Sequence, residues 1–142
     1  MRVLFIDTVH PILEEKLVQS GYLCEDGTKW NQSQILEKIA YYQGVVIRSK
    51  FTIDEEFLVH ATQLKFIARS GSGLENIDLD AAKKHGVKVF NSPEGNRNAV
   101  GEHALGMLLM LLNKLKQGDD EVRQGQWNRE KNRGIELDGL TI

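Results

Sequence analysis

The sequence predicts an α/β fold in which a parallel β-sheet is flanked by helices. Short β-rich runs alternate with amphipathic helical segments, and five such βα units favour a parallel sheet because right-handed crossovers are nearly obligatory. We expect a flavodoxin-like sheet of five strands in the order 2-1-3-4-5, with ligands at the carboxyl ends of the strands. The expected strands are Val3–Ile6, Tyr22–Glu25, Val45–Arg48, Phe66–Arg69 and Val87–Asn91. The expected helices are Pro11–Gln19, Gln32–Tyr42, Ile53–Ala61 and Leu79–His85.

Several of these helices carry end signals. Asn31 with Gln34, and Thr52 with Glu55, have the spacing of an N-cap residue and its reciprocal acceptor. Glycines follow three predicted helices, at the position where a left-handed backbone is favoured. They are Gly21, Gly44 and Gly86.

A longer helix is predicted over residues 99–117, with Asn98 as its N-cap. Its apolar residues cover nearly the whole circumference, so the helix should be buried on more than one side. An exposed stripe of this size would promote aggregation, and we therefore predict a homodimer through this helix. Residues 118–134 are expected to form a polar connection that Trp127 anchors, and Ile135–Ile142 the start of a strand.

Composition limits the possible functions. At 142 residues the chain can form one well-buried core but not two full domains. A net charge of −2, from 18 basic and 20 acidic residues, argues against nucleic acid as the main partner. The single cysteine, Cys24, fits a reducing compartment and an inert thiol, and no metal-ligand spacing is present. Without a signal peptide or an apolar run of membrane length, we expect a cytoplasmic protein with no membrane partner.

The segment Lys65–Asp78 is the most informative part of the chain. An apolar strand runs into a Gly-Ser-Gly turn, Ser70–Gly73, whose successive N–H groups could hold an anion. Asn76 stands where the dinucleotide fingerprint requires its third glycine, so the turn does not form a complete cofactor site. From the residues alone, an anion site and an ordinary βα turn are equally good interpretations.

The predicted strand order places this turn at one edge with Asp7–Thr8, Arg48–Lys50 and Asn91–Gly95. Arg48 ends a buried strand and could bind an anionic substrate bidentately, or it could form an ion pair with Asp7 or Glu75. Lys50 could attract a phosphate, or it could be a solvated surface lysine.

Five segments carry a family resemblance, in the family's order. Residues 47–49 (IRS) lead into Thr52, and the further segments are 69–78 (RSGSGLENID), 86–93 (GVKVFNSP), 96–105 (NRNAVGEHAL) and 125–127 (GQW), which precedes 136–142 (ELDGLTI). Together they resemble the D-isomer-specific 2-hydroxyacid dehydrogenases of the phosphoglycerate dehydrogenase type, over essentially the whole chain. Gly101 stands where the family more often has alanine.

The resemblance implies an NAD-dependent oxidoreductase that transfers hydride between the nicotinamide cofactor and a small anionic 2-hydroxy or 2-keto acid. It implies that the acid's carboxylate binds at Ser70, Gly71, Ser72 and Gly73, with Arg48 and Ser49 as further substrate contacts. By the same resemblance, Ser72 and Val100 correspond to family positions that lie near the cofactor.

The resemblance also implies a domain division. Residues 1–98 would form the substrate-binding domain, and residues 99–142 the opening helix and linker of a nucleotide-binding domain. In the family the strand that begins at Leu140 continues into GxGxxG, and the catalytic arginine, glutamate and histidine lie further on. We therefore expect an N-terminal fragment that is inactive, does not bind NAD tightly and contains no catalytic residue.

Other functions of the same fold compete with this one. A phosphoacceptor receiver needs an aspartate after the third strand and a lysine after the fifth, but Arg48-Ser49 and Asn91-Ser92 stand there. A nonenzymatic small-anion-binding or corepressor-like module stays open. Arg48 with Lys50 favours a phosphorylated acid such as 3-phosphoglycerate, while glyoxylate, lactate, longer hydroxyacids and the choice between NAD and NADP stay open.

Overall fold

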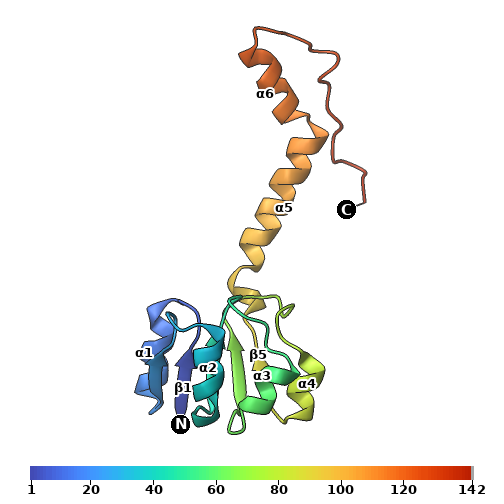
Figure 1. Ribbon diagram of the computed structural model, residues 1–142. Helices are drawn as coiled ribbons and strands as arrows, with labels where there is room; N and C mark the ends of the chain where they lie inside the picture. The colour runs from blue at the N-terminus through green and yellow to red at the C-terminus, as the bar shows by residue number, and fades with distance from the viewer. Residues whose placement is uncertain (142) are drawn as a thin grey trace. The chain divides into compact units, whose positions relative to one another are not determined.

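The computed structural model describes residues 1–141, and the chain forms two compact units, Met1–Asn96 and Arg97 onward. The first unit contains a five-stranded parallel sheet in the order β2-β1-β3-β4-β5, which confirms the predicted strand order (Figure 1). The strands are β1 Arg2–Phe5, β2 Leu23–Asp26, β3 Gly44–Ile47, β4 Phe66–Arg69 and β5 Lys88–Phe90. The helices of this unit are α1 Pro11–Gln19, α2 Gln32–Lys38, α3 Glu55–His60 and α4 Leu79–Lys84, with 3-10 turns η1 Ile39–Tyr41 and η2 Pro93–Gly95.

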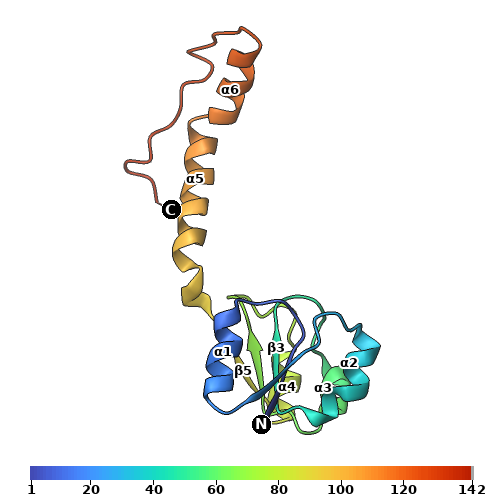
Figure 2. The same ribbon diagram turned by 90° about the vertical axis from the view of Figure 1, so that its left-hand side faces the viewer.

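Helices cover both faces of the sheet, as Figure 2 shows: α1 lies on one side and α2, α3 and α4 on the other. The alternation of side chains along β3 explains this division. Val45 and Ile47 belong to the larger hydrophobic cluster, whereas Val46 packs with Val3 and Phe5 in the smaller cluster beneath α1. All four residues of β3 are buried, as expected of a central parallel strand.

Most of the predicted helix ends of this unit are confirmed. Asn31 Oδ1 accepts the Gln34 N–H at 2.9 Å and Gln34 Oε1 accepts the Asn31 N–H at 3.0 Å, so α2 begins with a capping box. Gly21 and Gly86 have φ angles of 82° and 69°, the left-handed backbone predicted for them.

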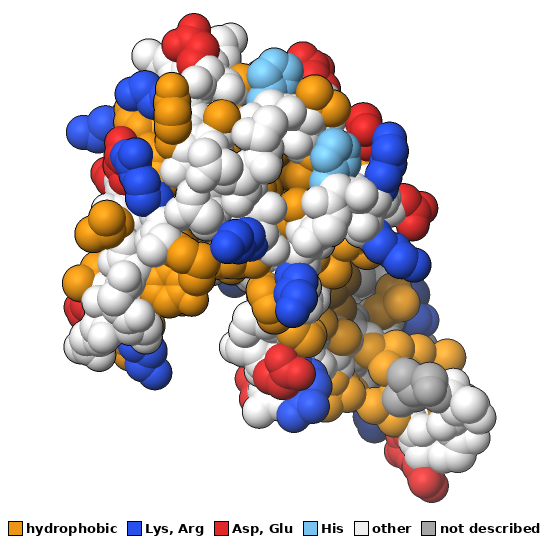
Figure 3. Space-filling view, turned by 90° about the horizontal axis from the view of Figure 1, so that it is seen from below, with side chains coloured by type: hydrophobic (Ala, Val, Ile, Leu, Met, Phe, Trp, Pro, Cys, Tyr) orange, Lys and Arg blue, Asp and Glu red, His pale blue; other side chains and the backbone are white. Residues whose placement is uncertain are grey.

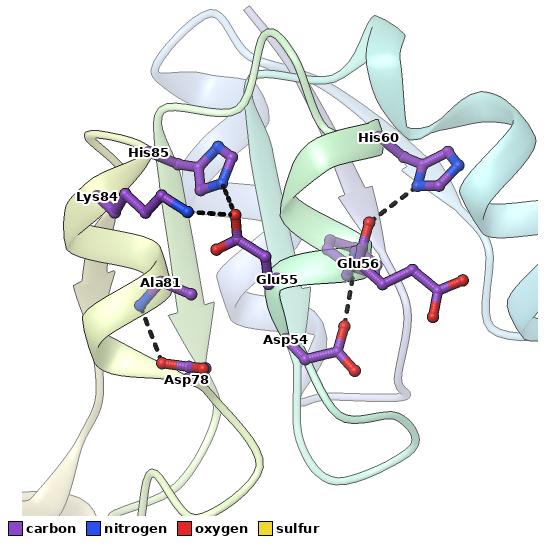
Figure 4. A network of polar contacts seen from close by, with 9 residues as sticks. Asp54, Glu55, Glu56, His60, Asp78, Ala81, Lys84 and His85 are labelled. Atoms are coloured by element: carbon purple, nitrogen blue, oxygen red, sulfur yellow. Dashed lines mark hydrogen bonds and ion pairs between the residues drawn. The ribbon is translucent and has the colours of Figure 1, made fainter.

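The start of α3 was predicted wrongly. Its N-cap is Asp54, not Thr52, and Asp54 Oδ1 accepts the Phe57 N–H at 3.0 Å (Figure 4). Glu55 is therefore free to accept hydrogen bonds from Lys84 Nζ at 2.7 Å and His85 Nε2 at 3.1 Å. These bonds lower the pKa of Glu55, but pairs this exposed contribute little to stability. Buried apolar side chains are what hold α3 against α4. They are Phe57, Leu58, Ala81 and Ala82.

The amino ends of the strands carry no concentration of one charge. Figure 3 looks onto this end of the first unit, where basic, acidic and histidine side chains are interspersed. It is the edge opposite to the one at which ligands bind in open α/β sheets.

Gly44 was also predicted wrongly, because it lies inside β3 and does not end a helix. The preceding turn ends at Tyr42 in an extended backbone, so no left-handed residue is needed there. Gly44 is required for packing instead: a Cβ at this position would lie 2.2 Å from Cζ of Phe66.

In the second unit the predicted 99–117 helix is two helices, α5 Arg97–Leu112 and α6 Leu115–Arg123. Asn98 lies within the first turn of α5 and is not its N-cap. The break falls at Lys114, whose φ of 49° is left-handed. Its Nζ donates to the Lys131 carbonyl at 2.7 Å, and the Ile135 N–H donates to the Leu112 carbonyl at 3.1 Å. The returning chain therefore satisfies the end of α5 and turns the backbone away from a continuous helix.

No residue of α5 is buried within the single chain, and the predicted burial of this helix by a partner stays a prediction. Val100 is 57 % exposed and Leu111 75 %. An apolar groove of ≈ 870 Å³ runs between α5 and α6, with Met107, Leu108, Met110 and Leu111 among its lining residues. None of the helices within residues 1–141 is long and apolar enough to cross a membrane.

Glu121, not Trp127, holds the chain that follows α6. Trp127 is 81 % exposed, whereas the Glu121 carboxylate is buried and bonded on all sides. Its donors are Asn132 Nδ2 at 2.6 Å, Lys131 Nζ at 2.9 Å, Asn128 Nδ2 at 3.0 Å and Gln117 Nε2 at 3.1 Å. Residues 135–141 form no strand, contrary to prediction, and Ile142 lies outside the described residues.

The Glu121 network should respond to acid. Hydrogen bonds from Lys131, Gln117, Asn128 and Asn132 lower the pKa of Glu121 to about 2, from a usual 4.5. Because the folded pKa is the lower one, the stabilisation is complete above pH 4.5 and is lost as the pH falls from 4.5 towards 2. We expect the side-chain amide NMR signals of Asn128 and Asn132 to shift with a midpoint near pH 2. Glu121→Gln should abolish this transition, and a midpoint at the usual carboxyl pKa would contradict the assignment.

Substitution of Gly44 should destabilise the first unit. Gly44→Ala must displace the Phe66 ring, and overpacking of this kind costs about 1–3 kcal/mol in the free energy of unfolding. Urea denaturation followed by circular dichroism measures it, and adding Phe66→Leu should recover part of the loss. Gly106→Ala is the control, because its Cβ would meet nothing within 4 Å. Equal stability of the two alanine variants would contradict the packing argument.

Candidate anion-binding site

The loops after β1, β3, β4 and β5 meet at one edge of the sheet, as predicted. The Ser70 N–H donates to the Ile47 carbonyl at 2.8 Å and links the loops after β3 and β4. The Ser92 N–H donates to the Gly71 carbonyl at 2.9 Å and links the loops after β4 and β5. Asp7, two residues beyond β1, completes the edge by bonding to the loop after β3.

Asp7 accepts three consecutive backbone N–H groups with a single oxygen. Its Oδ2 lies 2.7 Å from the nitrogen of Arg48, 3.0 Å from that of Ser49 and 3.1 Å from that of Lys50. Three successive amides that converge on one oxygen form an anion-binding concavity. Here the anion is a side chain of the protein itself.

The Ser70–Gly73 turn divides into two halves with different roles. The N–H groups of Ser70 and Gly71 are used internally, on the carbonyls of Ile47 and Arg69. The carbonyls of Gly71 and Ser72 accept from the Ser92 N–H and from Asn91 Nδ2, the latter at 2.7 Å. Within residues 1–141, the N–H groups of Ser72 and Gly73 donate to no protein acceptor. These two amides are the donors that the turn offers to an anion.

Gly71 is also needed for the geometry of this turn, whereas a Cβ on Gly73 would meet only the movable end of the Glu75 side chain. Gly71 has φ +154°, and a Cβ there would lie 1.6 Å from Arg69 Nη1. A Cβ on Gly73 would lie 2.1 Å from Oε1 of Glu75. The two interpretations of the turn are therefore compatible, because the backbone that glycine permits is the one that leaves the next two amides unpaired.

Arg48 is exposed, and no carboxylate within residues 1–141 lies within 4.0 Å of its guanidinium. The alternative ion pair with Asp7 or Glu75 does not form, since Asp7 binds the backbone N–H of Arg48 instead. Arg48 is thus a cation available to a ligand at this edge. Ser49 is exposed beside it, with its N–H bound to Asp7.

Lys50 has a structural role that neither interpretation included. Its side chain is half-buried, and its Nζ donates to the carbonyls of Thr28 at 2.5 Å and Trp30 at 2.8 Å. Lys50 therefore ties the loop after β3 to the loop after β2, and two of the three N–H donors of its ammonium are used within the protein. No local signal in the sequence indicates this contact, because it joins residues that are 20 and 22 positions apart.

Two further candidates belong to other segments of the chain. Val100 is an exposed residue of α5, in the second unit. Cys24 is half-buried against the smaller cluster; burial, with a further effect of Glu14, raises the pKa of its thiol and disfavours the reactive thiolate. No group of three or more potential metal ligands is found among the residues the structure describes.

Sequence reasoning missed the roles of two residues. Asp7 was named only as part of the edge and as a possible ion-pair partner of Arg48, and Asn91 only as part of the edge. A short polar side chain directly after a parallel strand is the signal that could have identified both, because such a residue can reach the backbone of the neighbouring loop.

Comparisons with known proteins agree with this architecture. The family model described as D-isomer specific 2-hydroxyacid dehydrogenase, catalytic domain, matches residues 3–140. The D-3-phosphoglycerate dehydrogenase of Archaeoglobus fulgidus is 34 % identical over 141 residues, 99 % of this chain and 27 % of that protein. That of Mycobacterium leprae is 36 % identical over 138 residues, 92 % of this chain and 26 % of that protein.

A solved structure of a 3-phosphoglycerate dehydrogenase also matches this chain. The crystal structure of NAD+-bound 3-phosphoglycerate dehydrogenase from Entamoeba histolytica has a TM-score of 0.63 and 30 % identity, and the match covers 80 % of this chain and 40 % of that one. The chain spans about a quarter of the length of the two sequence relatives named above.

Proposed function

Because the chain belongs to the D-isomer-specific 2-hydroxyacid dehydrogenase family, we propose that it is the substrate-holding portion of an NAD-dependent enzyme of the phosphoglycerate dehydrogenase type. The reaction is hydride transfer between the nicotinamide cofactor and C2 of a 2-hydroxy or 2-keto acid. A cytoplasmic location accompanies the proposal, supported by the single cysteine of the chain.

One observation carries this proposal: the N–H groups of Ser72 and Gly73 have no acceptor within residues 1–141 and lie at the carboxyl edge of the sheet. Backbone amides bind a carboxylate without titrating, and a guanidinium adds a permanent positive charge. Arg48 begins the neighbouring loop, since Ile47 pairs with Arg69 in the sheet. We propose that the acid's carboxylate binds these amides with Arg48, and that Ser49, Ser70 and Gly71 form the surrounding wall.

The residues of this chain fit only part of an NAD molecule. The Ser70–Gly73 turn lacks the third glycine of the dinucleotide fingerprint, so it is not a complete site for the pyrophosphate. Ser72 and Val100 are proposed as contacts for the nicotinamide end, by their likeness to family positions. When bound, NAD supplies the hydride acceptor or donor, while this chain holds the acid and orients its C2.

We further propose that the 142 residues do not catalyse the reaction alone. The match extends over about a quarter of the length of the sequence relatives. The residues that bind the phosphate of the substrate and those that act as acid and base would belong to polypeptide outside this match.

For the substrate we propose 3-phosphoglycerate or its 2-keto product. Lys50 does not support this choice, because its ammonium is bound to the Thr28 and Trp30 carbonyls. The support comes from the exposed Arg48 and from relatives that are D-3-phosphoglycerate dehydrogenases.

Binding can be tested without catalysis. Titrating the chain with 3-phosphoglycerate should shift the backbone NMR signals of Ser72 and Gly73, whereas neutral glycerol should not. Arg48→Gln should weaken the binding about tenfold, the order expected when a charged hydrogen bond is lost. Arg2→Gln is the control, because Arg2 pairs with Glu25 and lies in β1, away from this edge. Shifts that avoid Ser72 and Gly73 would remove the proposal.

The proposed assembly is a homodimer through residues 99–117. Its support is the exposed apolar surface of α5, where Val100, Leu105, Met107 and Leu111 are each about half or more exposed. Monomeric proteins rarely expose contiguous apolar patches larger than a few hundred Å².

Sedimentation can test this assembly. We expect a dimer at micromolar concentration, and Leu111→Glu should shift it towards monomer because a charge would be buried at the interface. Val18→Glu is the matched control, because Val18 is also an exposed apolar helical residue but lies in α1. A stable, well-behaved wild-type monomer would contradict the dimer.

A further inference from the structure

The loop after β3 contains an anion-binding concavity next to the proposed acid site. The backbone N–H groups of Arg48, Ser49 and Lys50 all converge on Asp7 Oδ2. Had Asp7 been an apolar residue, these three donors would lie unpaired at the edge of the sheet. They would then form an anion site with one more donor than Ser72 and Gly73 provide.

The two sets of amides start at the same level of the sheet. Ile47 pairs with Arg69, so the loops that follow β3 and β4 leave neighbouring strands side by side. An acid with a single carboxylate would therefore have two places to bind at this edge. Asp7 comes from β1, on the other side of β3, and fills one of them.

The backbone of this loop is held from both sides. Asp7 binds its three amides, and Lys50 Nζ donates to the carbonyls of Thr28 and Trp30 in the loop after β2. The guanidinium of Arg48 is the part of the loop that stays exposed and without a carboxylate partner within residues 1–141. Fixing a backbone from which a charged side chain projects reduces the entropy lost when a ligand binds.

We propose that Asp7 is the positioning residue of the acid site. By occupying the amides of residues 48–50, it directs the carboxylate of the acid to Ser72 and Gly73 and holds Arg48 beside them. This inference rests on the proposed function, because it assigns a role within the same site. It goes beyond that function by naming an acidic residue that determines where an acid binds.

The test follows backbone amide NMR signals in the full 142-residue chain, with 3-phosphoglycerate as the probe. In the wild type the probe should shift Ser72 and Gly73. In Asp7→Ala the shifts should leave Ser72 and Gly73 and move to the amides of residues 48–50, because three donors are then available there. Asp7→Asn keeps an acceptor oxygen in place and should retain the wild-type pattern of shifts.

Asp54→Ala is the matched control. It removes an aspartate that also caps backbone, at the Phe57 N–H, so it should lower stability without moving the probe. Formate should bind the vacated amides of Asp7→Ala and raise its thermal stability, but it should not rescue Asp54→Ala, which frees a single donor. If Asp7→Ala folds only when formate is present, the assignment of the concavity is supported.

The outcomes separate the two proposals. If the probe does not shift Ser72 and Gly73 in the wild type, the proposed function fails. If it does, but Asp7→Ala shows an unchanged pattern of shifts, only the role of Asp7 is overturned. Failure of formate to restore either the fold or the amide signals of Asp7→Ala also overturns it.

Discussion

The parallel register of β1, β3 and β4 is the constraint on which the rest of the first unit depends. Phe5 pairs with Val46 and Ile47 with Arg69, so the chain leaves all three strands at one level. Burial specifies this register strongly, because a slip of one residue would turn the apolar side chains of β3 to the wrong face. Burying a side chain of the size of Val or Ile contributes about 1.5–3 kcal/mol, and three such side chains of β3 are fully buried. The polar contacts at the edge follow from that alignment.

The alternation of apolar runs and helical stripes was enough to predict the βα units, because short-range patterns determine where strands and helices form. The rules for parallel α/β sheets then supplied the strand order. The start of α3 could not be predicted in the same way. Thr52 and Asp54 are both good N-cap residues two positions apart. A bridge between Ile53 and Ile77 decides between them: Ile53 N–H donates to the Asn76 carbonyl at 2.8 Å, which keeps Ile53 extended and delays the helix. That bridge joins residues 24 positions apart, which no local pattern reveals.

The same distinction applies to the candidate site. The Gly-Ser-Gly turn was visible in the sequence, but the amides that stay unpaired depend on acceptors from other strands. Ile47 takes the N–H of Ser70, while Asn91 and Ser92 fix the carbonyls of Ser72 and Gly71. The Lys50 contacts with the loop after β2 are likewise tertiary. The residue types were enough to predict which edge of the sheet carries the candidate site. Long-range hydrogen bonds determine which backbone N–H groups and side chains at that edge are available to bind a ligand.

The second unit is organised by a different interaction. Among the described residues from Arg97 onward, the one buried side chain is the carboxylate of Glu121, and no apolar side chain is fully buried. A charged group so enclosed is favourable only while its donors remain in place, so this segment gains its order from Lys131 and two asparagines. The apolar residues of α5 contribute almost nothing to that order within one chain. Their hydrophobic free energy becomes available only when α5 contacts further polypeptide, and this is the physical basis of the proposed dimer.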